Sequence, residues 1–154
     1  MIINRYPLGV ESAQKKTATI LVYASNAAVR EVISSGLGSN LGNGLPDHKV
    51  REFATGNALR LFVDDGGKFD LLIVDAEAAP EGGLGLARQL KDEVYNCPPV
   101  LAIIARPSDS WLGKWSRAEE LILHPIDPFT LGEKCGKLLA KRFGISSTRD
   151  ISHV

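Results

Sequence analysis

The sequence predicts a doubly wound α/β fold, in which one five-stranded parallel sheet carries helices on both of its faces. Three nearly unbroken apolar runs, ATILVY, LLIV and VLAIIA, are typical of strands that are buried on both faces. A helical pattern follows each of these runs after a short connection. Strands that alternate with helices in this way indicate a parallel sheet.

Length, composition and charge fit a single soluble globular domain. The chain has 154 residues, of which 44% are hydrophobic and 23% are charged. Its 18 basic and 18 acidic residues cancel, so no net field favours nucleic acid or a membrane surface as a partner. The chain has no apolar run of ~20 residues and no signal-peptide pattern, so we expect a cytoplasmic protein without membrane insertion. Cys97 and Cys135 lack metal-ligand spacing, and we expect both to be reduced.

The two ends of the chain differ from its middle. Residues 1–17 include Pro7 and Gly9 and have no sustained hydrophobic period. The last residues are polar as well. We therefore predict a flexible N-terminal arm over 1–17, one domain over 18–143 and a fraying C-terminal tail over 144–154.

The first strand and the first helix are clearly marked. The run Ala18–Tyr23 predicts a strand, and Asn26 is placed to cap a helix over 27–33. The Gly- and Asn-rich segment 36–47 predicts a flexible loop. Because it follows a helix and lacks the Gly-Lys-Ser/Thr ending of a phosphate loop, we do not assign a nucleotide to it.

The second strand and helix are less apolar than the first pair. The segment Lys49–Ala54 is short and rather polar, which predicts an edge strand. A helix over 57–63 follows, and its apolar residues Ala58, Leu61 and Phe62 have helical spacing.

The third strand, LLIV, ends on a carboxylate, Asp75. A loop with Pro80 and the pair Gly82-Gly83 leads to a helix that begins near Leu84. A lone carboxylate at the carboxyl end of a central parallel strand lies where open α/β sheets place their chemistry. Asp75 is therefore the leading candidate for function, although it could simply cap the following loop through backbone amides.

The last third of the chain repeats the pattern with shorter elements. Val100–Ala105 predicts the fourth strand, and a short fifth strand covers 121–123. Between them, Trp111 and Trp115 lie on one face of a short helix, and we expect at least one ring to pack onto the sheet.

The final helix is predicted to begin at Asp127 or Pro128. Its inner face is expected to consist of Leu131, Cys135, Leu138 and Leu139. Its solvated face has the basic residues Lys134, Lys137, Lys141 and Arg142. This patch is too sparse to predict DNA binding.

Five strands favour the flavodoxin-like strand order 2-1-3-4-5. This order makes the first, third and fourth strands central, and these are the three most apolar strands. The carboxyl ends of the first and third strands then meet at the point where the strand order reverses, next to the ends of the last two strands. The residues expected at this edge are Ser25, Asn26, Asp75, Ile104, Ala105 and His124.

Four stretches in this order carry a resemblance to a known family: ILVYASNAAVRE, LLIVDAEAAPEGGLGLARQL, PPVLAIIARPSD and LILHPIDPFTL. From about 19 to 142 the chain resembles the CheY-like receiver domain of response regulators in two-component, or phosphorelay, signalling. The stretch CPPVLAIIARPSDSWLGKWSRAE is also similar to stand-alone actinobacterial receiver proteins, which have no output domain.

The resemblance implies that Asp75 is the phosphoacceptor, but most of the family's other active residues are replaced. The acidic pair that holds Mg²⁺ falls on Ala24 and Ser25, and the Ser/Thr of the fourth strand falls on Ile104. The Lys before Pro in the fifth strand falls on His124, which implies a cis bond to Pro125.

These replacements predict an atypical receiver with weak Mg²⁺ binding through Asp75 and no other cofactor. Mg²⁺ prefers carboxylate and other hard oxygen ligands, and neutral side chains at the two acidic positions are poor substitutes. Glu77 is the one nearby carboxylate that could replace them. Because phosphoryl transfer depends on such charges, we expect it to be slow.

Three functions stay open at this point. The first is a receiver that is not an enzyme and acts by binding another protein, either a histidine kinase, a non-kinase target or a second copy of itself. The partner face would then consist of Trp111, Lys114, Trp115 and Arg117. The second is a fully phosphorylatable receiver that uses Asp75 and Glu77. The third is a small flavodoxin-like enzyme that binds a cofactor, although the chain shows no nucleophile–base pair.

Overall fold

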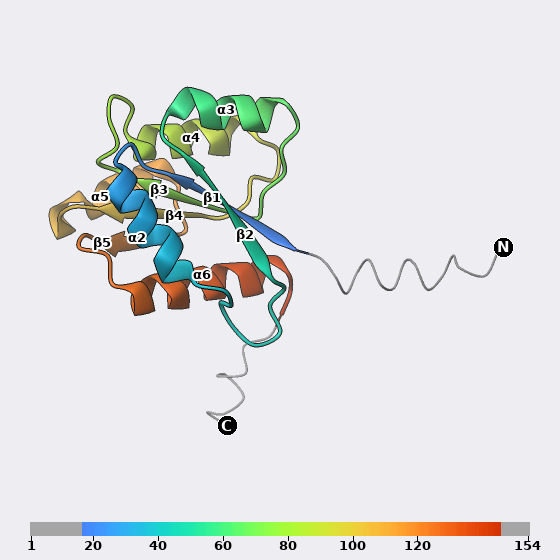
Figure 1. The fold of residues 1–154 in the computed structure, drawn as a ribbon. Helices are drawn as coiled ribbons and strands as arrows, with labels where there is room; N and C mark the ends of the chain where they lie inside the picture. Colours follow the sequence, from blue (N-terminus) through green and yellow to red (C-terminus); the bar gives the residue numbers. More distant parts are fainter. Residues whose placement is uncertain (1–16, 146–154) are drawn as a thin grey trace, which may run out of the picture.

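The computed structural model describes residues 17–145 (Figure 1). The predicted arm over 1–17 and tail over 144–154 therefore lie outside the described residues, apart from Thr17, Gly144 and Ile145.

Five parallel strands form one sheet in the order β2-β1-β3-β4-β5, as the sequence predicts. No neighbouring pair of strands in the described chain is antiparallel. The strands are β1 (Ala18–Tyr23), β2 (His48–Phe53), β3 (Leu71–Asp75), β4 (Val100–Ile104) and β5 (Glu120–Leu123). The edge position predicted for the second strand is confirmed, since β2 pairs with β1 alone.

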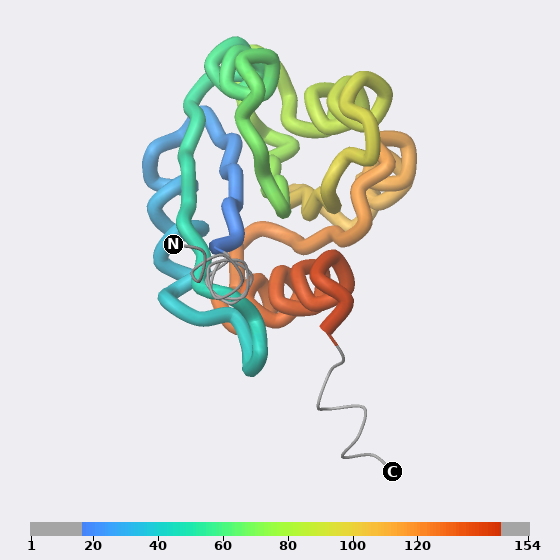
Figure 2. The backbone as a smooth tube through the Cα atoms, turned by 90° about the vertical axis from the view of Figure 1, so that its right-hand side faces the viewer, coloured from blue at the N-terminus to red at the C-terminus, as the bar shows by residue number. Residues whose placement is uncertain are grey.

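Helices cover both faces of the sheet, with α2 and α6 on one face and α3 and α4 on the other (Figures 1 and 2). The short helix α5 lies against α4, next to β5. The helices are α2 (Ala27–Leu37), α3 (Gly56–Asp64), α4 (Gly83–Glu93), α5 (Ser110–Ser116) and α6 (Pro128–Arg142), with a 3₁₀ turn, η2 (Pro107–Asp109), before α5.

Each central strand supplies both layers of the core because its side chains alternate between the two faces. In β1, Ile20 and Val22 pack with α2 and α6, while Leu21 and Tyr23 pack with α3 and α4. Every residue of β3 and β4 is buried. Burying a side chain of this size stabilises the fold by about 1.5–3 kcal/mol, so these strands fix the position of Asp75.

Side-chain caps begin the two helices that share one face. The Asn26 side chain accepts from the backbone N–H groups of Ala28 and Val29, as predicted for the start of α2. Asp127 caps α6 and accepts from both the backbone and the hydroxyl of Thr130, and these bonds lower the pKa of its carboxyl.

The predicted flexible loop differs in the structure. Gly36 and Leu37 belong to α2, and the loop that follows packs onto α6 through half-buried Leu41. The close contact needs Gly136, since a Cβ there would lie 2.6 Å from the carbonyl oxygen of Leu41. The packing therefore orders a segment whose composition indicates a loop without fixed contacts.

The helix predicted over 57–63 is present, but of its three named apolar residues only Phe62 packs toward the sheet. Leu59 is the buried leucine of α3, whereas Leu61 is 62% exposed and Ala58 is exposed as well. Phe62 packs against Phe53 of β2 with the ring centroids 5.6 Å apart. The start of α3 at Gly56 turns Leu59 and Phe62, rather than Leu61, toward the sheet.

Two further expectations concern the thiols and the membrane. Cys97 and Cys135 are both free in the structure. Among residues 17–145, no helix combines the length and the apolar character that a membrane span needs.

We expect iodoacetamide to modify Cys97 while Cys135 stays unmodified until the protein unfolds. Burial raises the pKa of Cys135 to about 12, and the side chain is inaccessible. Only the thiolate reacts, so a raised pKa slows the reaction below that pKa. Burial raises the pKa of Cys97 too, but this thiol is half-buried. Peptide mass spectrometry at about pH 8 would measure both rates, and equal rates in the folded protein would contradict the expectation.

Candidate functional site

Asp75 is the last residue of β3, the middle strand of the sheet, and its residue surface is only 3% exposed. Both neighbouring strands, β1 and β4, end beside it. The residue therefore lies at the edge that the strand order predicts. A buried carboxylate requires hydrogen-bond partners, because burying an unpaired charge is costly.

One oxygen of Asp75 has two such partners. Oδ1 lies 3.0 Å from Nε2 of His124 and accepts from the backbone N–H of Glu77, also at 3.0 Å. Since an ionised carboxylate only accepts, Nε2 of His124 carries the proton in this contact. Asp75 thus caps its own loop, as the simpler interpretation held, and also binds the imidazole of the residue that directly follows β5.

Ser25 and Asn26 are used locally at the end of β1. The Ser25 hydroxyl oxygen accepts from the backbone N–H of Ala79 at 3.0 Å and joins β1 to the loop after β3. The Asn26 side chain is directed to the first turn of α2. Ala24 before them is fully buried. None of these three residues has a described hydrogen bond to Asp75.

Arg30 is a residue of this edge that sequence reasoning missed. Its Nη1 donates to the carbonyl oxygens of Ala24 at 2.7 Å and Ser25 at 3.2 Å. Its Nε lies 3.4 Å from the carboxylate of Glu52 at the end of β2. A guanidinium therefore binds the backbone at Ala24 and Ser25, the two positions at which the resemblance implies acids. Only the position of Arg30 in the first turns of α2 could have suggested this.

The loop after Asp75 is held to α3 by a second set of contacts. The Tyr23 hydroxyl donates to the carbonyl oxygen of Glu81 at 2.5 Å, and burial, together with the Glu81 carboxylate, raises the pKa of Tyr23. Arg60 pairs with the Glu81 carboxylate and donates to Gln89 at 3.0 Å and to Asn57 at 3.1 Å. These contacts fix the loop that supplies the Glu77 and Ala79 amides.

The side chains of the remaining predicted residues have no described hydrogen bond to Asp75. Ile104 is buried, Ala105 is half-buried and Glu77 is exposed. The bond between His124 and Pro125 is cis, which confirms the expectation from the resemblance, and the bond between Ala79 and Pro80 is cis as well.

These residues do not fit a receiver-type Mg²⁺ site. Asp75 supplies one carboxylate, and its Oδ1 already accepts two hydrogen bonds. Ala24 has no ligand atom, and the Ser25 hydroxyl is engaged by Ala79. In the described part of the chain, no three or more His, Cys, Asp or Glu side chains are grouped so that they could hold a metal ion. Divalent Mg²⁺ needs several oxygen ligands in near-octahedral geometry.

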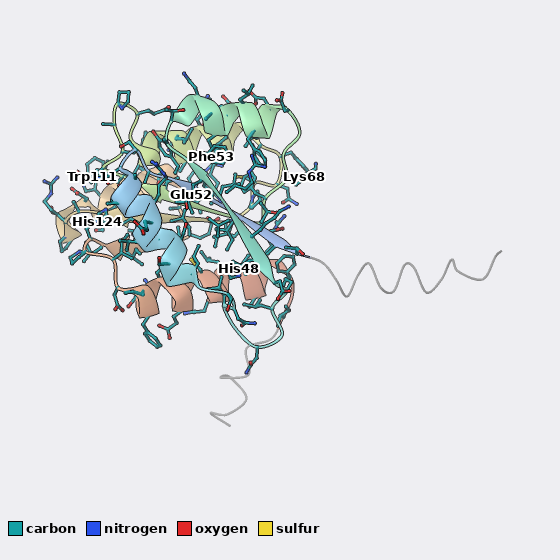
Figure 3. All side chains as sticks on the ribbon, viewed as in Figure 1. His48, Glu52, Phe53, Lys68, Trp111 and His124 are labelled. Carbon is teal, nitrogen blue, oxygen red and sulfur yellow. The ribbon has the colours of Figure 1, made fainter. Side chains whose placement is uncertain are left out.

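The prediction that one tryptophan ring packs onto the sheet is wrong. Trp111 is 64% exposed and Trp115 is 44% exposed, because α5 turns Gly113 and Ser116 inward. Arg88 of α4 lies over the Trp115 ring at 5.0 Å and donates to its carbonyl oxygen at 2.6 Å. Trp111 and His124 lie at the same end of the molecule (Figure 3).

The two cations predicted on this face differ in their contacts. Arg117 pairs with Asp92 and donates to the carbonyl oxygen of Lys91 at 3.2 Å, so it joins α5 to α4. The Lys114 side chain is exposed, and its ammonium group has no hydrogen bond or ion pair within residues 17–145. Of the two, Lys114 is the one whose charge is available to a partner.

Replacing His124 by alanine is expected to destabilise the fold by about 1–3 kcal/mol, because it removes a hydrogen-bond partner of a buried carboxylate. The substitution leaves Oδ1 of Asp75 with the Glu77 amide alone. Urea denaturation would measure the loss. His124→Gln, which offers a neutral donor, serves as the control and should lose less. Unchanged stability in His124→Ala would contradict the described contact.

Comparison with known proteins places this geometry in a family. No protein-family model matches the chain. An uncharacterized response regulatory protein of Mycobacterium tuberculosis, found in two strains, is 48% identical over 120 residues, covering 78% of this chain and 90% of the relative.

Solved structures agree on the fold. A CheY-like receiver domain protein from Methanospirillum hungatei covers 84% of this chain and 98% of its own, with 18% identity and a TM-score of 0.69. The chemotaxis response regulator CheY4 of Vibrio cholerae covers 80% and 100%, with 20% identity and a TM-score of 0.67. The Mycobacterium tuberculosis relative is nearly half identical in sequence, and the solved receiver structures have the same fold. The chain therefore belongs to the response regulators and forms a receiver domain of two-component signalling.

Proposed function

We propose that this receiver acts through protein–protein contact and accepts a phosphoryl group on Asp75 slowly or not at all. The observation that carries the proposal is the state of Asp75, whose Oδ1 is bound by His124 and by the Glu77 amide where the family has a metal site. Response regulators are signalling proteins rather than classical enzymes, and receiver domains interact with other proteins.

Electrostatics supports slow phosphoryl transfer. The reaction is accelerated mainly by positioning and by cations that neutralise the transferred group. Two unit charges ~4 Å apart interact by roughly 4 kcal/mol at an effective dielectric constant near 20, so a site without two carboxylates binds Mg²⁺ much less tightly. Glu77 is the nearby carboxylate that could replace the two missing acids, and its side chain is exposed.

The same residues support a partner face that hardly responds to phosphate. A ligand shifts a conformational equilibrium only through different contacts with its two states. Ile104 has no hydroxyl that could bind a phosphoryl oxygen, and His124 is already bound to unmodified Asp75. Phosphate on Asp75 would therefore gain few new contacts with which to repack α5, β5 and α6.

We place the partner on the surface of α5 and β5. A groove of about 620 Å³ lies between α5 and α6 over β5, lined by Ile104, Pro107 and Leu123 among others. Trp111 is exposed on the neighbouring helix, and aromatic anchors of this kind carry much of the energy in protein interfaces. The partner is a protein, either a kinase, a non-kinase target or a second copy of this chain.

Phosphorylation is tested by intact-mass spectrometry after incubation with Mg²⁺ and acetyl phosphate, with Asp75→Asn as the blank. We expect little or no gain of one phosphoryl mass on the wild-type chain. Rapid and complete modification that Asp75→Asn abolishes would contradict the proposal. If Glu77→Gln also abolished it, the alternative of a working phosphorelay receiver with Glu77 as metal ligand would hold.

Partner binding is tested by pull-down from lysate with matched variants. Asp75→Asn should retain the partner, whereas Trp111→Ala or Lys114→Glu should lose it. Leu61→Ala, which truncates an exposed apolar side chain on α3, is the control and should have no effect. If Asp75→Asn loses the partner and the α5 variants keep it, the protein is an ordinary phosphate-driven switch.

A further inference from the structure

A second groove lies at the opposite end of the sheet from Asp75, where β4 and β5 begin. It has a volume of about 500 Å³ and lies between the segment 96–99, the start of β5 and the C-terminal half of α6. We call it the amino-end groove. Its size falls within the range of about 300–1,000 Å³ that is usual for small-molecule sites.

The groove has apolar walls. The prolines Pro98 and Pro99 line one side, and Leu138 of α6 lines the other. Pro98 and Leu138 belong to the buried residues of the fold, so this part of the surface does not move independently of the core. The half-buried thiol of Cys97 also lines the groove, and burial raises its pKa, so it is mostly an uncharged apolar group. An aliphatic or aromatic ligand group would therefore displace water from this surface.

The acids at the groove are already neutralised by other residues. Glu119 accepts from the backbone N–H of Val100 at 2.7 Å with one oxygen and pairs with Lys91 at 2.6 Å with the other. Glu120 pairs with Lys134 at 3.1 Å. Neither Lys91 nor Lys134 lines the groove. The cations that pair with Glu119 and Glu120 therefore lie outside it.

The bases at the groove are not neutralised to the same extent. Arg142 pairs with Asp70 at 2.9 Å. The side chains of Lys137 and Lys141, one turn apart on α6, are exposed, and their ammonium groups have no hydrogen bond or ion pair within the described residues. Two ammonium groups over an apolar surface therefore remain without counter-charges from the described chain.

We propose that the amino-end groove binds a small amphipathic anion, such as an aliphatic carboxylate. Its charged end would contact Lys137 and Lys141, and its apolar part would lie along Leu138, Pro98 and the Cys97 thiol. The site is independent of the proposed function, because Asp75 lies at the other end of the strands. It also differs from the α5 surface proposed for the protein partner, since the linings of the two grooves have no residue in common.

Cys97 provides a direct test, because its thiol lies inside the groove. Iodoacetamide labelling of the full chain would be followed with octanoate, octanol or acetate present. We expect octanoate to slow Cys97 labelling in a saturable way, octanol to slow it less and acetate to leave it unchanged. Cys135, which lies in the core, reports any unfolding by the additives.

A charge variant locates the anion. Lys137→Gln with Lys141→Gln should weaken the protection by octanoate by about tenfold, since exposed ion pairs each contribute a modest amount. The control, Lys49→Gln, removes an exposed charge from β2, which does not line the groove, and should keep full protection. Amide NMR shifts upon octanoate addition, confined to Asn96, Cys97 and 137–142, are the second expected result.

Three results would overturn the proposal. The first is Cys97 labelling that octanoate does not slow, together with no amide shifts around the groove. The second is equal protection by octanol and octanoate, which would mean that the anion is irrelevant. The third is full protection in the Lys137→Gln, Lys141→Gln variant, which would place the charge elsewhere. Asp75→Asn should leave all of these readouts unchanged.

Discussion

Replacing Gly83 by alanine is expected to lower the free energy of unfolding by about 2–4 kcal/mol, through overpacking against backbone that has no room to move. Gly83 begins α4 directly after the loop that follows Asp75. A Cβ at this position would lie 2.5 Å from the carbonyl oxygen of Asp75 and 2.9 Å from Cβ of Val74. Since β3 is buried throughout, α4 would have to shift away from the sheet.

Gly85 on the same helix provides the matched control. A Cβ there would meet no atom within 4 Å, and the residue is exposed. Gly85→Ala should therefore stabilise the protein, by up to about 1 kcal/mol from helix propensity. Urea denaturation of both variants would measure the contrast. Equal effects of the two substitutions would mean that α4 does not approach Asp75 as closely as described.

The strands and their order were predictable because the signal is contained in each segment. A run such as ATILVY can be buried on both faces only in the interior of a parallel sheet, and the polar residues of Lys49–Ala54 suit only its edge. Because crossover connections between parallel strands are right-handed and short, few strand orders are then possible. The position of Asp75 was predictable for the same reason, since the end of an apolar run marks the end of its strand.

The faces of short helices were not predictable in the same way. In α3, Leu59 and Leu61 are both leucines, and only the exact start of the helix decides which one is buried. In α5, Trp111 and Trp115 have the spacing of a core face, yet the inward positions are Gly113 and Ser116. Gly113 is needed there, because a Cβ would lie 2.5 Å from a methyl group of Leu121. Close approach of the α5 backbone to the Leu121 side chain, rather than hydrophobicity, selects the face of α5.

The contacts of the candidate site depend on pairs of residues from distant segments. Sequence reasoning placed His124 and Asp75 at one edge, but the bond between them depends on side-chain conformations that the pattern does not contain. Arg30 and the Arg60–Glu81 pair gave no sequence signal, because charged residues on exposed helices are usually solvated. The resemblance identified which family groups are missing, whereas only the structure shows which groups now lie in their place.

Three hydrogen bonds attach the loop after Asp75 to the neighbouring strand ends. Ser25 binds the Ala79 amide, Tyr23 binds the Glu81 carbonyl, and Asp75 binds the Glu77 amide, so the whole loop is attached to β1 and β3. A metal ion entering here would have to compete with these bonds as well as bind without an acidic pair. We therefore expect the loop to keep one conformation whether Mg²⁺ is present or absent.

Restoring the acidic pair should produce the largest functional change. We expect wild-type protein to bind Mg²⁺ with millimolar affinity or not at all, and the variant Ala24→Asp with Ser25→Asp to bind it at least about tenfold more tightly, because each added carboxylate attracts the dication. Ala24 is fully buried, so the two added charges should also destabilise the metal-free variant. Mg²⁺ should then raise its thermal midpoint, while leaving that of the wild type unchanged.

The control for this variant is Ala24→Asn with Ser25→Asn, which has nearly the same shape but no added charge. It should show the wild-type response to Mg²⁺ in both isothermal titration calorimetry and thermal unfolding. Micromolar Mg²⁺ affinity in the wild type would contradict the conclusion that these residues do not fit a Mg²⁺ site. If the acidic variant gained no affinity, positions 24 and 25 would not face Asp75, and the slow phosphorylation that we propose for this receiver would need a cause other than the lost carboxylates.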